Sequence, residues 1–212
     1  DKDKPKVPLI SVLRRPKALI LTMFAGAAGF ALQVLLPTFA VGYSAAGGTA
    51  RSDVLYAFAW ASVISIFMVV GSGLLSDALG RRPVMIAGLV LYVAFLFPMF
   101  PMLRSDSWLV ILAAFTIALA LHGMIYGPLA AFIAEQFGTE SRYTGASLGY
   151  QLATLLGAGF TPTIVASLYA GPGGGESTMP VIGFIAAISA VSAIAILLTR
   201  ESKDHDLLIH EH

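Results

Sequence analysis

The chain contains no cysteine, and only 12% of its 212 residues are charged. The absence of cysteine excludes disulfides, zinc–thiolate sites and thiol catalysis. A soluble domain usually has about a quarter charged residues, so this chain has too few ions to cover a surface that faces water. It also lacks an H-E-x-x-H pattern, a Walker loop and a cluster of metal ligands. We therefore expect no enzyme, no bound metal and no cofactor.

The chain consists mainly of long hydrophobic segments. Hydrophobic residues make up 57% of the chain, and the mean hydropathy is +0.82. Six stretches between charged residues each exceed the roughly 20 residues that cross a bilayer, whereas a membrane barrel would show alternating segments of about ten. We predict an all-α integral membrane protein with six transmembrane helices, at residues 17–43, 54–77, 83–103, 108–133, 143–169 and 179–199.

The lysines and arginines predict the orientation of these helices. With both termini on one side of the membrane, eleven of the 13 basic residues fall on that side, and only Arg51 and Arg104 fall opposite. The positive-inside rule then places both termini in the cytoplasm. Residues 1–16 read as a basic linker without a signal-peptide core, 17–200 as the membrane domain and 201–212 as a tail. Binding of the linker to anionic lipids is the alternative to a purely topological role.

A charged loop separates the second and third predicted helices. Gly73, Asp77, Gly80, Arg81 and Arg82 form the pattern G-x-x-x-D-x-x-G-R-R. This pattern resembles the signature loop of the major facilitator superfamily, the secondary transporters that move small solutes by alternating access. The resemblance implies the C-terminal half of a twelve-helix fold, built from two inverted three-helix repeats.

A second pair of motifs narrows the resemblance. Residues 127–135, Gly-Pro-Leu-Ala-Ala-Phe-Ile-Ala-Glu, are followed by residues 142–151, Arg-Tyr-Thr-Gly-Ala-Ser-Leu-Gly-Tyr-Gln. Together they resemble the metabolite/proton symporter branch, whose members carry dicarboxylates, citrate, shikimate or proline and betaine. The resemblance implies a small carboxylate or zwitterion as solute and protons as the coupling ion. It also implies an N-terminal six-helix half as partner and a bacterial inner membrane as location, with no nucleic acid.

Polar side chains within the predicted spans are the candidate solute contacts: Gln33, His122, Tyr126, Tyr150 and Gln151. A glutamine at membrane depth needs hydrogen-bond partners, which a solute or a neighbouring helix can supply. His122 is the only titratable side chain near the centre of a span, and its imidazole could exchange a proton near neutral pH. A neutral histidine bonded inside the bundle is the alternative. In that case the coupling acid lies in the N-terminal half.

Five charged residues are predicted at one depth beside the two motifs: Asp77, Arg81, Arg82, Glu135 and Arg142. In the resembled family such charges, with Gly73 and Gly80 in the loop, form a network that holds the cytoplasmic side closed. The alternative is that they are ordinary interface charges that fix the topology.

Helix breakers fall in the first and fourth predicted spans, which correspond in the two repeats. Pro37 lies in the first span, and Gly123, Gly127 and Pro128 lie in the fourth. Broken helices at matching positions predict a cavity, while the alternative is a proline tolerated near a helix end. The G-x-x-x-G spacing of Gly123 and Gly127 indicates close packing between helices.

Two functions from different classes remain open at this point. The first is solute transport, with this chain supplying one half of the pathway. The second is a non-transporting receptor-like or scaffold protein of the same fold, which would act by binding a partner. An upstream six-helix half with charges inside the membrane would favour the first, and a soluble domain there would favour the second.

Overall fold

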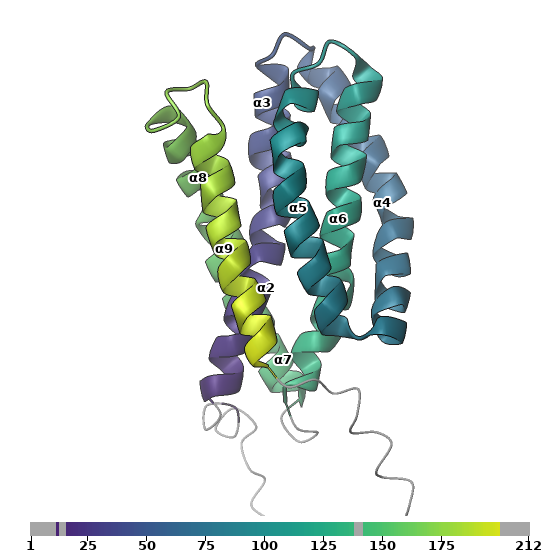
Figure 1. Ribbon diagram of the computed structural model, residues 1–212, viewed down its shortest axis with the longest axis vertical. Helices are drawn as coiled ribbons and strands as arrows, with labels where there is room; N and C mark the ends of the chain where they lie inside the picture. Colours follow the sequence, from purple (N-terminus) through teal and green to yellow (C-terminus); the bar gives the residue numbers. More distant parts are fainter. Residues whose placement is uncertain (1–11, 13–15, 138–141, 200–212) are drawn as a thin grey trace, which may run out of the picture.

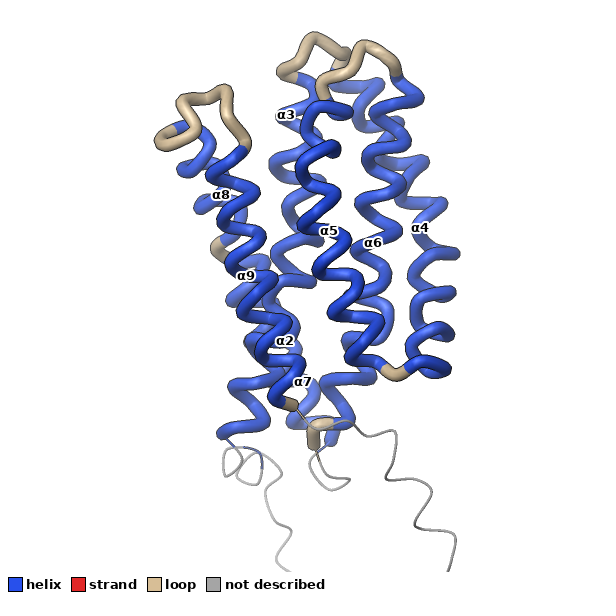
Figure 2. The backbone as a smooth tube through the Cα atoms, viewed as in Figure 1, coloured by secondary structure: helices blue, strands red, loops and turns tan. Residues whose placement is uncertain are grey.

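The structure, a computed structural model, describes Val12, residues 16–137 and residues 142–199. The predicted linker of residues 1–16 and the tail of residues 201–212 lie almost wholly outside these described residues. In the described part every regular element is helical (Figures 1 and 2). The elements are α2 (Pro16–Leu35), η1 (Leu36–Ala40), α3 (Val41–Ala45), α4 (Arg51–Leu79), α5 (Arg81–Leu103), α6 (Trp108–Glu135), α7 (Arg142–Thr154), η2 (Leu155–Gly159), α8 (Thr161–Ala170) and α9 (Met179–Leu198).

These elements make six helices that are long and apolar enough to cross a membrane, as the sequence predicts. The first is α2 with η1 and α3, and the fifth is α7 with η2 and α8. The predicted ranges agree with the observed ones to within three residues at each end. Two sequence features explain this agreement: each span is predominantly apolar along its length, and the charged or glycine-rich loops end it abruptly.

The first and fifth spans each contain one wide π-helical turn, η1 and η2. Pro37 lies within η1, and Pro162 lies at the start of α8 just beyond η2. Proline has no N–H, so it leaves a carbonyl of the preceding turn without its helical partner. A threonine beside each proline donates its hydroxyl to a nearby carbonyl: Thr38 to Val34, and Thr161 to Gly157, both over 2.5 Å.

The break predicted in the fourth span is wrong, because α6 runs without interruption from Trp108 to Glu135, through Pro128. Gly123 and Gly127 serve instead to bring α6 against α4. A Cβ atom on Gly127 would lie only 2.8 Å from the carbonyl oxygen of Val69, and one on Gly123 would lie 3.3 Å from the Val69 side chain. Tight packing on α4 thus accompanies an uninterrupted α6, and the wide turn occurs in the fifth span.

The packing of the six spans follows a reciprocal pattern. The first span packs mainly on the fifth span and α9, and α6 packs mainly on α4 and α5. The third and sixth spans, α5 and α9, are also in contact. The first span thus contacts the fifth and sixth, and the fourth span contacts the second and third in the same way. This correspondence between the first three and the last three spans agrees with two three-helix repeats. The first span lies innermost, with 61% of its apolar window buried, against 17% for α4.

The bundle has two ends, which we name by the described chain. The terminal end holds Pro16, Leu198 and the connection between α4 and α5; it lies at the bottom of Figure 1. The loop end holds the connections after Ala45, Leu103 and Ala170, at the top. At the terminal end the chain turns directly from α4 into α5 at Gly80, whose φ of +102° favours glycine. This turn accounts for the second glycine of the charged motif.

Candidate functional site

Four aromatic side chains gather between the first, fourth and fifth spans. They are Phe30 of α2, His122 and Tyr126 of α6, and Tyr150 of α7. The hydroxyls of Tyr126 and Tyr150 share a hydrogen bond of 2.7 Å. The Phe30 ring meets Tyr150 edge-on at 4.7 Å between centroids and Tyr126 at 6.1 Å. His122 stacks on Tyr126 at 5.3 Å. We call these four residues the aromatic cluster.

Small residues on α2 and α7 allow the helices to approach closely enough to form this cluster. A Cβ atom on Gly26 would lie 2.9 Å from the Cβ of Ala153. One on Gly149 would lie 2.8 Å from the hydroxyl of Thr22. Close backbone approach of this kind is typical of helix packing in membranes. It sets Tyr150, the residue after Gly149, against Phe30.

His122 is anchored to the backbone of α2. Its Nε2 atom lies 3.0 Å from the carbonyl oxygen of Gly29, and its side chain is buried. A carbonyl can only accept a hydrogen bond, so Nε2 carries the proton. This contact corresponds to the alternative in which the histidine bonds inside the bundle. It also explains how α6 is fixed against α2 beside the aromatic cluster.

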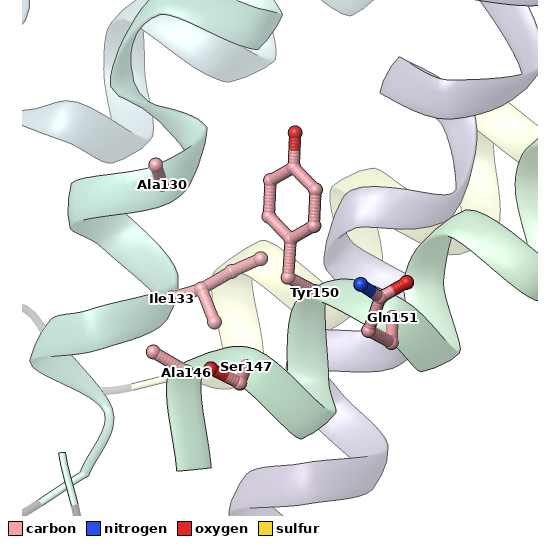
Figure 3. A pocket seen from close by; sticks show the side chains of 6 residues that line it. All are labelled: Ala130, Ile133, Ala146, Ser147, Tyr150 and Gln151. Atoms are coloured by element: carbon pink, nitrogen blue, oxygen red, sulfur yellow. The ribbon is translucent and has the colours of Figure 1, made fainter. Parts of the chain in front are cut away.

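An open hollow of about 280 Å³ lies beside the cluster, between α6 and α7 (Figure 3). Tyr150 and Gln151 project from neighbouring positions of α7 in different directions, and Ser147 lies one turn earlier. The remaining lining is apolar: Ala130, Ile133 and Ala146. None of the six lining side chains carries a charge. The hollow can therefore offer hydroxyl and amide hydrogen bonds over an apolar wall.

The structure brings together three of the five predicted solute contacts, His122, Tyr126 and Tyr150, and places Gln151 on the same hollow as Tyr150. Gln33 stays apart from that lining. It is exposed on α2, three residues after Phe30 and so at a neighbouring position on one helix face.

Three of the five predicted charges, Asp77, Arg81 and Glu135, meet at the terminal end. Nε of Arg81 donates to Oε1 of Glu135 over 2.7 Å, and Nη1 of the same arginine lies 3.2 Å from Oδ1 of Asp77. The first pair is mostly buried, while the Asp77 side chain is 61% exposed. Arg81 therefore ties together the ends of α4, α5 and α6. Arg82 is partly buried on α5, and Arg142 is exposed at the start of α7.

Residues Gly145-Ala146-Ser147-Leu148-Gly149 match the G-x-S-x-G pattern of hydrolases. They lie inside α7, whereas a nucleophile elbow needs a strand-to-helix turn. Among the described residues no three histidine or carboxylate side chains lie close enough to hold a metal. Neither feature supports catalysis.

Three features of the structure were not predicted: the packing of Phe30 on Tyr126 and Tyr150, the hydrogen bonds of Ser192 with the backbone of α2, and the contacts of Arg104 at the loop end. There the Arg104 guanidinium lies 4.1 Å from the centre of the Tyr43 ring and donates to the Tyr169 hydroxyl over 3.4 Å. An apolar Phe30 gives no signal in the sequence. Ser189 and Ser192 are visible in the sequence, because they are two hydroxyl residues one turn apart in an otherwise apolar span.

Comparison with known proteins agrees with this architecture. The Major Facilitator Superfamily profile matches residues 18–211. The chain belongs to the major facilitator superfamily. Its members named below are transporters, so this facilitator chain is not an enzyme.

Three relatives illustrate the branch. The inner membrane metabolite transport protein YhjE of Escherichia coli (strain K12) is 33% identical over 97% of this facilitator chain and 48% of its own length. The shikimate transporter of the same organism is 30% identical over 94% of the chain and 46% of its own length. The citrate-proton symporter of Klebsiella pneumoniae is 32% identical over 70% of the chain and 36% of its own length. The chain thus spans about half the length of the first two.

Proposed function

We propose that this chain is the C-terminal six-helix half of a proton-coupled symporter, which moves a small carboxylate or zwitterion by alternating access. The observation that carries the proposal is the hydrogen-bonded pair of Tyr126 and Tyr150 beside the open hollow. The named solutes of the relatives, shikimate and citrate, support the substrate class. A partner of six further helices would close the pathway around the hollow.

In this proposal Tyr150 and Gln151 contact the solute directly, and Gln33 faces it from α2. The hollow has no charged lining residue, so it binds the hydroxyl or amide groups of the solute. The ionic group of a carboxylate or zwitterion then requires a charge from the other half. Tyr126 orients Tyr150 through the shared hydrogen bond, and His122 fixes α6 through its bond to Gly29.

Proton coupling is assigned to the other half of the transporter. The carboxylates in the described part of the chain lie at helix ends or in loops: Asp53, Asp77, Asp106, Glu135 and Glu176. The one imidazole within a described span, that of His122, already bonds a backbone carbonyl. A proton carrier must load and release its proton during each cycle, and an acid that faces the pathway serves that purpose better.

The terminal end is assigned to the cytoplasm of a bacterium with both termini on that side, since most basic residues of the chain fall there. The chain lies in the lipid bilayer of the inner membrane. The network of Asp77, Arg81, Arg82, Glu135 and Arg142 holds this side closed in the outward-open state. The ion pairs of Arg81 with Asp77 and Glu135 support this role. Gly80 forms the turn beside the network, and Gly73 lies inside α4 rather than in a loop as the sequence suggested.

Uptake by the complete protein in proteoliposomes tests the proposal. Radiolabelled shikimate, citrate and proline are the probes, each measured with and without an inward proton gradient. We expect saturable, gradient-dependent uptake of one probe, and a several-fold higher KM for Tyr150→Phe, which loses one hydroxyl bond worth about 1 kcal/mol. Ser147→Ala removes another hydroxyl from the same hollow, and its KM tests whether Ser147 also contacts the solute.

Binding without flux would support the receptor-like alternative instead of transport. The present chain alone should show no saturable uptake, because the pathway needs both halves. Uptake by this chain alone would disprove the half-pathway arrangement.

A further inference from the structure

Ser192 of α9 makes a contact with the first span that lies outside the solute site. Its hydroxyl accepts a hydrogen bond from the backbone N–H of Ala28 at 3.0 Å and donates one to the carbonyl of Phe24 at 2.7 Å. Phe24 and Ala28 are four residues apart, so they are the acceptor and donor of one helical turn. Ser192 is fully buried. A single side chain thus binds both backbone groups of a turn in the neighbouring helix.

Other elements hold the same part of α2 from different sides. His122 of α6 bonds the carbonyl of Gly29, the residue after Ala28. Gly157 of η2 lies so close to the carbonyl of Ala27 that no side chain fits between them. The backbone of residues 24–29 is therefore fixed by α9, α6 and η2 together.

Phe30 connects this turn to the solute site. It follows Gly29 directly, and its buried ring packs edge-on against Tyr150 at 4.7 Å. A shift or rotation of α2 at residues 24–29 would carry Phe30 with it. Because aromatic side chains in a packed core have few alternative positions, Tyr150 would move as well.

We propose that Ser192 is a positioning residue for solute recognition. It holds the turn between Phe24 and Ala28 so that Phe30 keeps Tyr150 at the wall of the hollow. The inference rests on the proposed function, which makes Tyr150 a solute contact. Ser192 itself does not line the hollow. It acts through α2 and touches no solute.

The same helix offers a matched control. Ser189 lies one turn before Ser192 and is also buried, but its hydroxyl makes no hydrogen bond within the described part of the chain. Ser189→Ala and Ser192→Ala remove the same atom from the same helix. Only the second removes the two bonds to α2. Ser192→Thr keeps a hydroxyl and should restore them.

The first test reports on Tyr150 without any solute. Fluorotyrosine is placed at position 150 of the complete detergent-purified protein, and its fluorine NMR resonance is recorded. We expect Ser192→Ala to shift and broaden the resonance, Ser189→Ala to leave it unchanged and Ser192→Thr to return it toward the wild-type position. An unchanged resonance in Ser192→Ala overturns the proposal. If that variant does not accumulate, Ser192→Cys, a much weaker donor, should give a smaller shift in the same direction.

The second test measures uptake of radiolabelled shikimate, citrate and proline. Loss of the Ser192 bonds should raise the KM of the transported probe about three- to tenfold, because a typical bond contributes about 0.5 to 1.5 kcal/mol. The maximal rate should stay close to that of Ser189→Ala. A shifted resonance with an unchanged KM overturns the link to recognition. A shifted resonance in a protein that transports no probe rejects the proposed solute class, while the positioning of Tyr150 by Ser192 stands.

Discussion

Arg81 at the start of α5 and Glu135 at the end of α6 are joined by a hydrogen-bonded ion pair of 2.7 Å. Their side chains are 24% and 31% exposed, whereas Asp77, the second partner of Arg81, is 61% exposed. The two pairs share one guanidinium but lie in different surroundings. Water screens the Asp77 pair more than the Glu135 pair.

A double-mutant cycle should separate these two pairs. We expect a coupling energy of about 1 kcal/mol or more between Arg81→Gln and Glu135→Gln, because charged hydrogen bonds that are partly buried are stronger than exposed ones. Arg81→Gln with Asp77→Asn should couple by less than about 0.5 kcal/mol. Reversible unfolding of the complete protein in detergent measures both values. Equal couplings would show that burial does not distinguish the pairs.

Gly157→Ala should destabilise the protein, because the new Cβ atom would strike the carbonyl of Ala27 and the Cβ of Phe30. Overpacking of this kind costs typically about 1–3 kcal/mol. Gly183→Ala on α9 is the control, since nothing lies within 4 Å of its Cβ position. It should be neutral or stabilising by up to about 1 kcal/mol, because alanine favours helices. The measurement is the free energy of unfolding of each variant. A Gly157→Ala variant as stable as the wild type would contradict the close packing at Gly157.

Arg104→Gln should loosen the loop end. The substitution removes the guanidinium from the Tyr43 ring and the bond to Tyr169, contacts that join the first, third and fifth spans. A partly exposed cation–π contact contributes about 0.5 to 1 kcal/mol, which sets the expected loss of stability. Arg51→Gln, an exposed arginine at the same end, should have little effect. A loss as large in Arg51→Gln would point to general charge rather than to this contact.

Gln33→Ala and Gln151→Ala should weaken solute binding in the complete protein while expression stays near normal. Both side chains are exposed in this half, so their removal leaves no buried partner unsatisfied. Thermal shifts with shikimate, citrate and proline measure the binding, because ligand stabilisation grows with occupancy. If neither variant changes the concentration dependence of the thermal shift, then neither residue contacts the solute.

The sequence predicted the six spans because apolar length and charged loops are local signals. It did not predict where a helix widens. Pro37, Pro128 and Pro162 all lie in or at the start of a helical segment, yet only the first and last accompany a π turn. Pro98 and Pro101 also lie inside an uninterrupted helix, α5, so a proline by itself does not predict a wide turn. The close contact of Gly127 with Val69 on α4, which no local pattern reveals, accompanies the uninterrupted fourth span.

The candidate site was predicted in part for the same reason. Polar residues in an apolar span are visible in the sequence, so Tyr126, Tyr150 and His122 were identified. Their mutual distances depend on how α6 and α7 pack on α2. Phe30, which contacts two of them, resembles any other apolar residue of α2 until the helices are assembled. The two serines of α9 differ only in their register against α2.

The last prediction concerns Asp77, the exposed member of the network at the terminal end. Its pairing with Arg81 at 3.2 Å is too exposed to stabilise the fold by more than about 1 kcal/mol. A carboxylate that meets the positive N-terminus of a helix from the other half would add about 0.3 to 2 kcal/mol in the state where the halves touch. That energy would act on one conformation only, so its loss would shift a balance of a few kcal/mol between two states. Asp77→Asn keeps the size of the side chain and removes its charge.

In the complete transporter we therefore expect Asp77→Asn to reduce turnover strongly, with small changes in unfolding free energy and KM, and to raise the inward-open population. Spin-label distances across the proposed cytoplasmic mouth, recorded together with uptake, measure both effects. Asp53→Asn is the control, because Asp53 is an exposed carboxylate at the opposite end of the same helix. Wild-type distances and uptake rates in Asp77→Asn would show that these charges do not gate transport and act only as topology signals. A gating contact is confined to the side of the membrane that closes. A similar loss of turnover in Asp53→Asn would therefore show that the effect of Asp77→Asn is not specific to the terminal end.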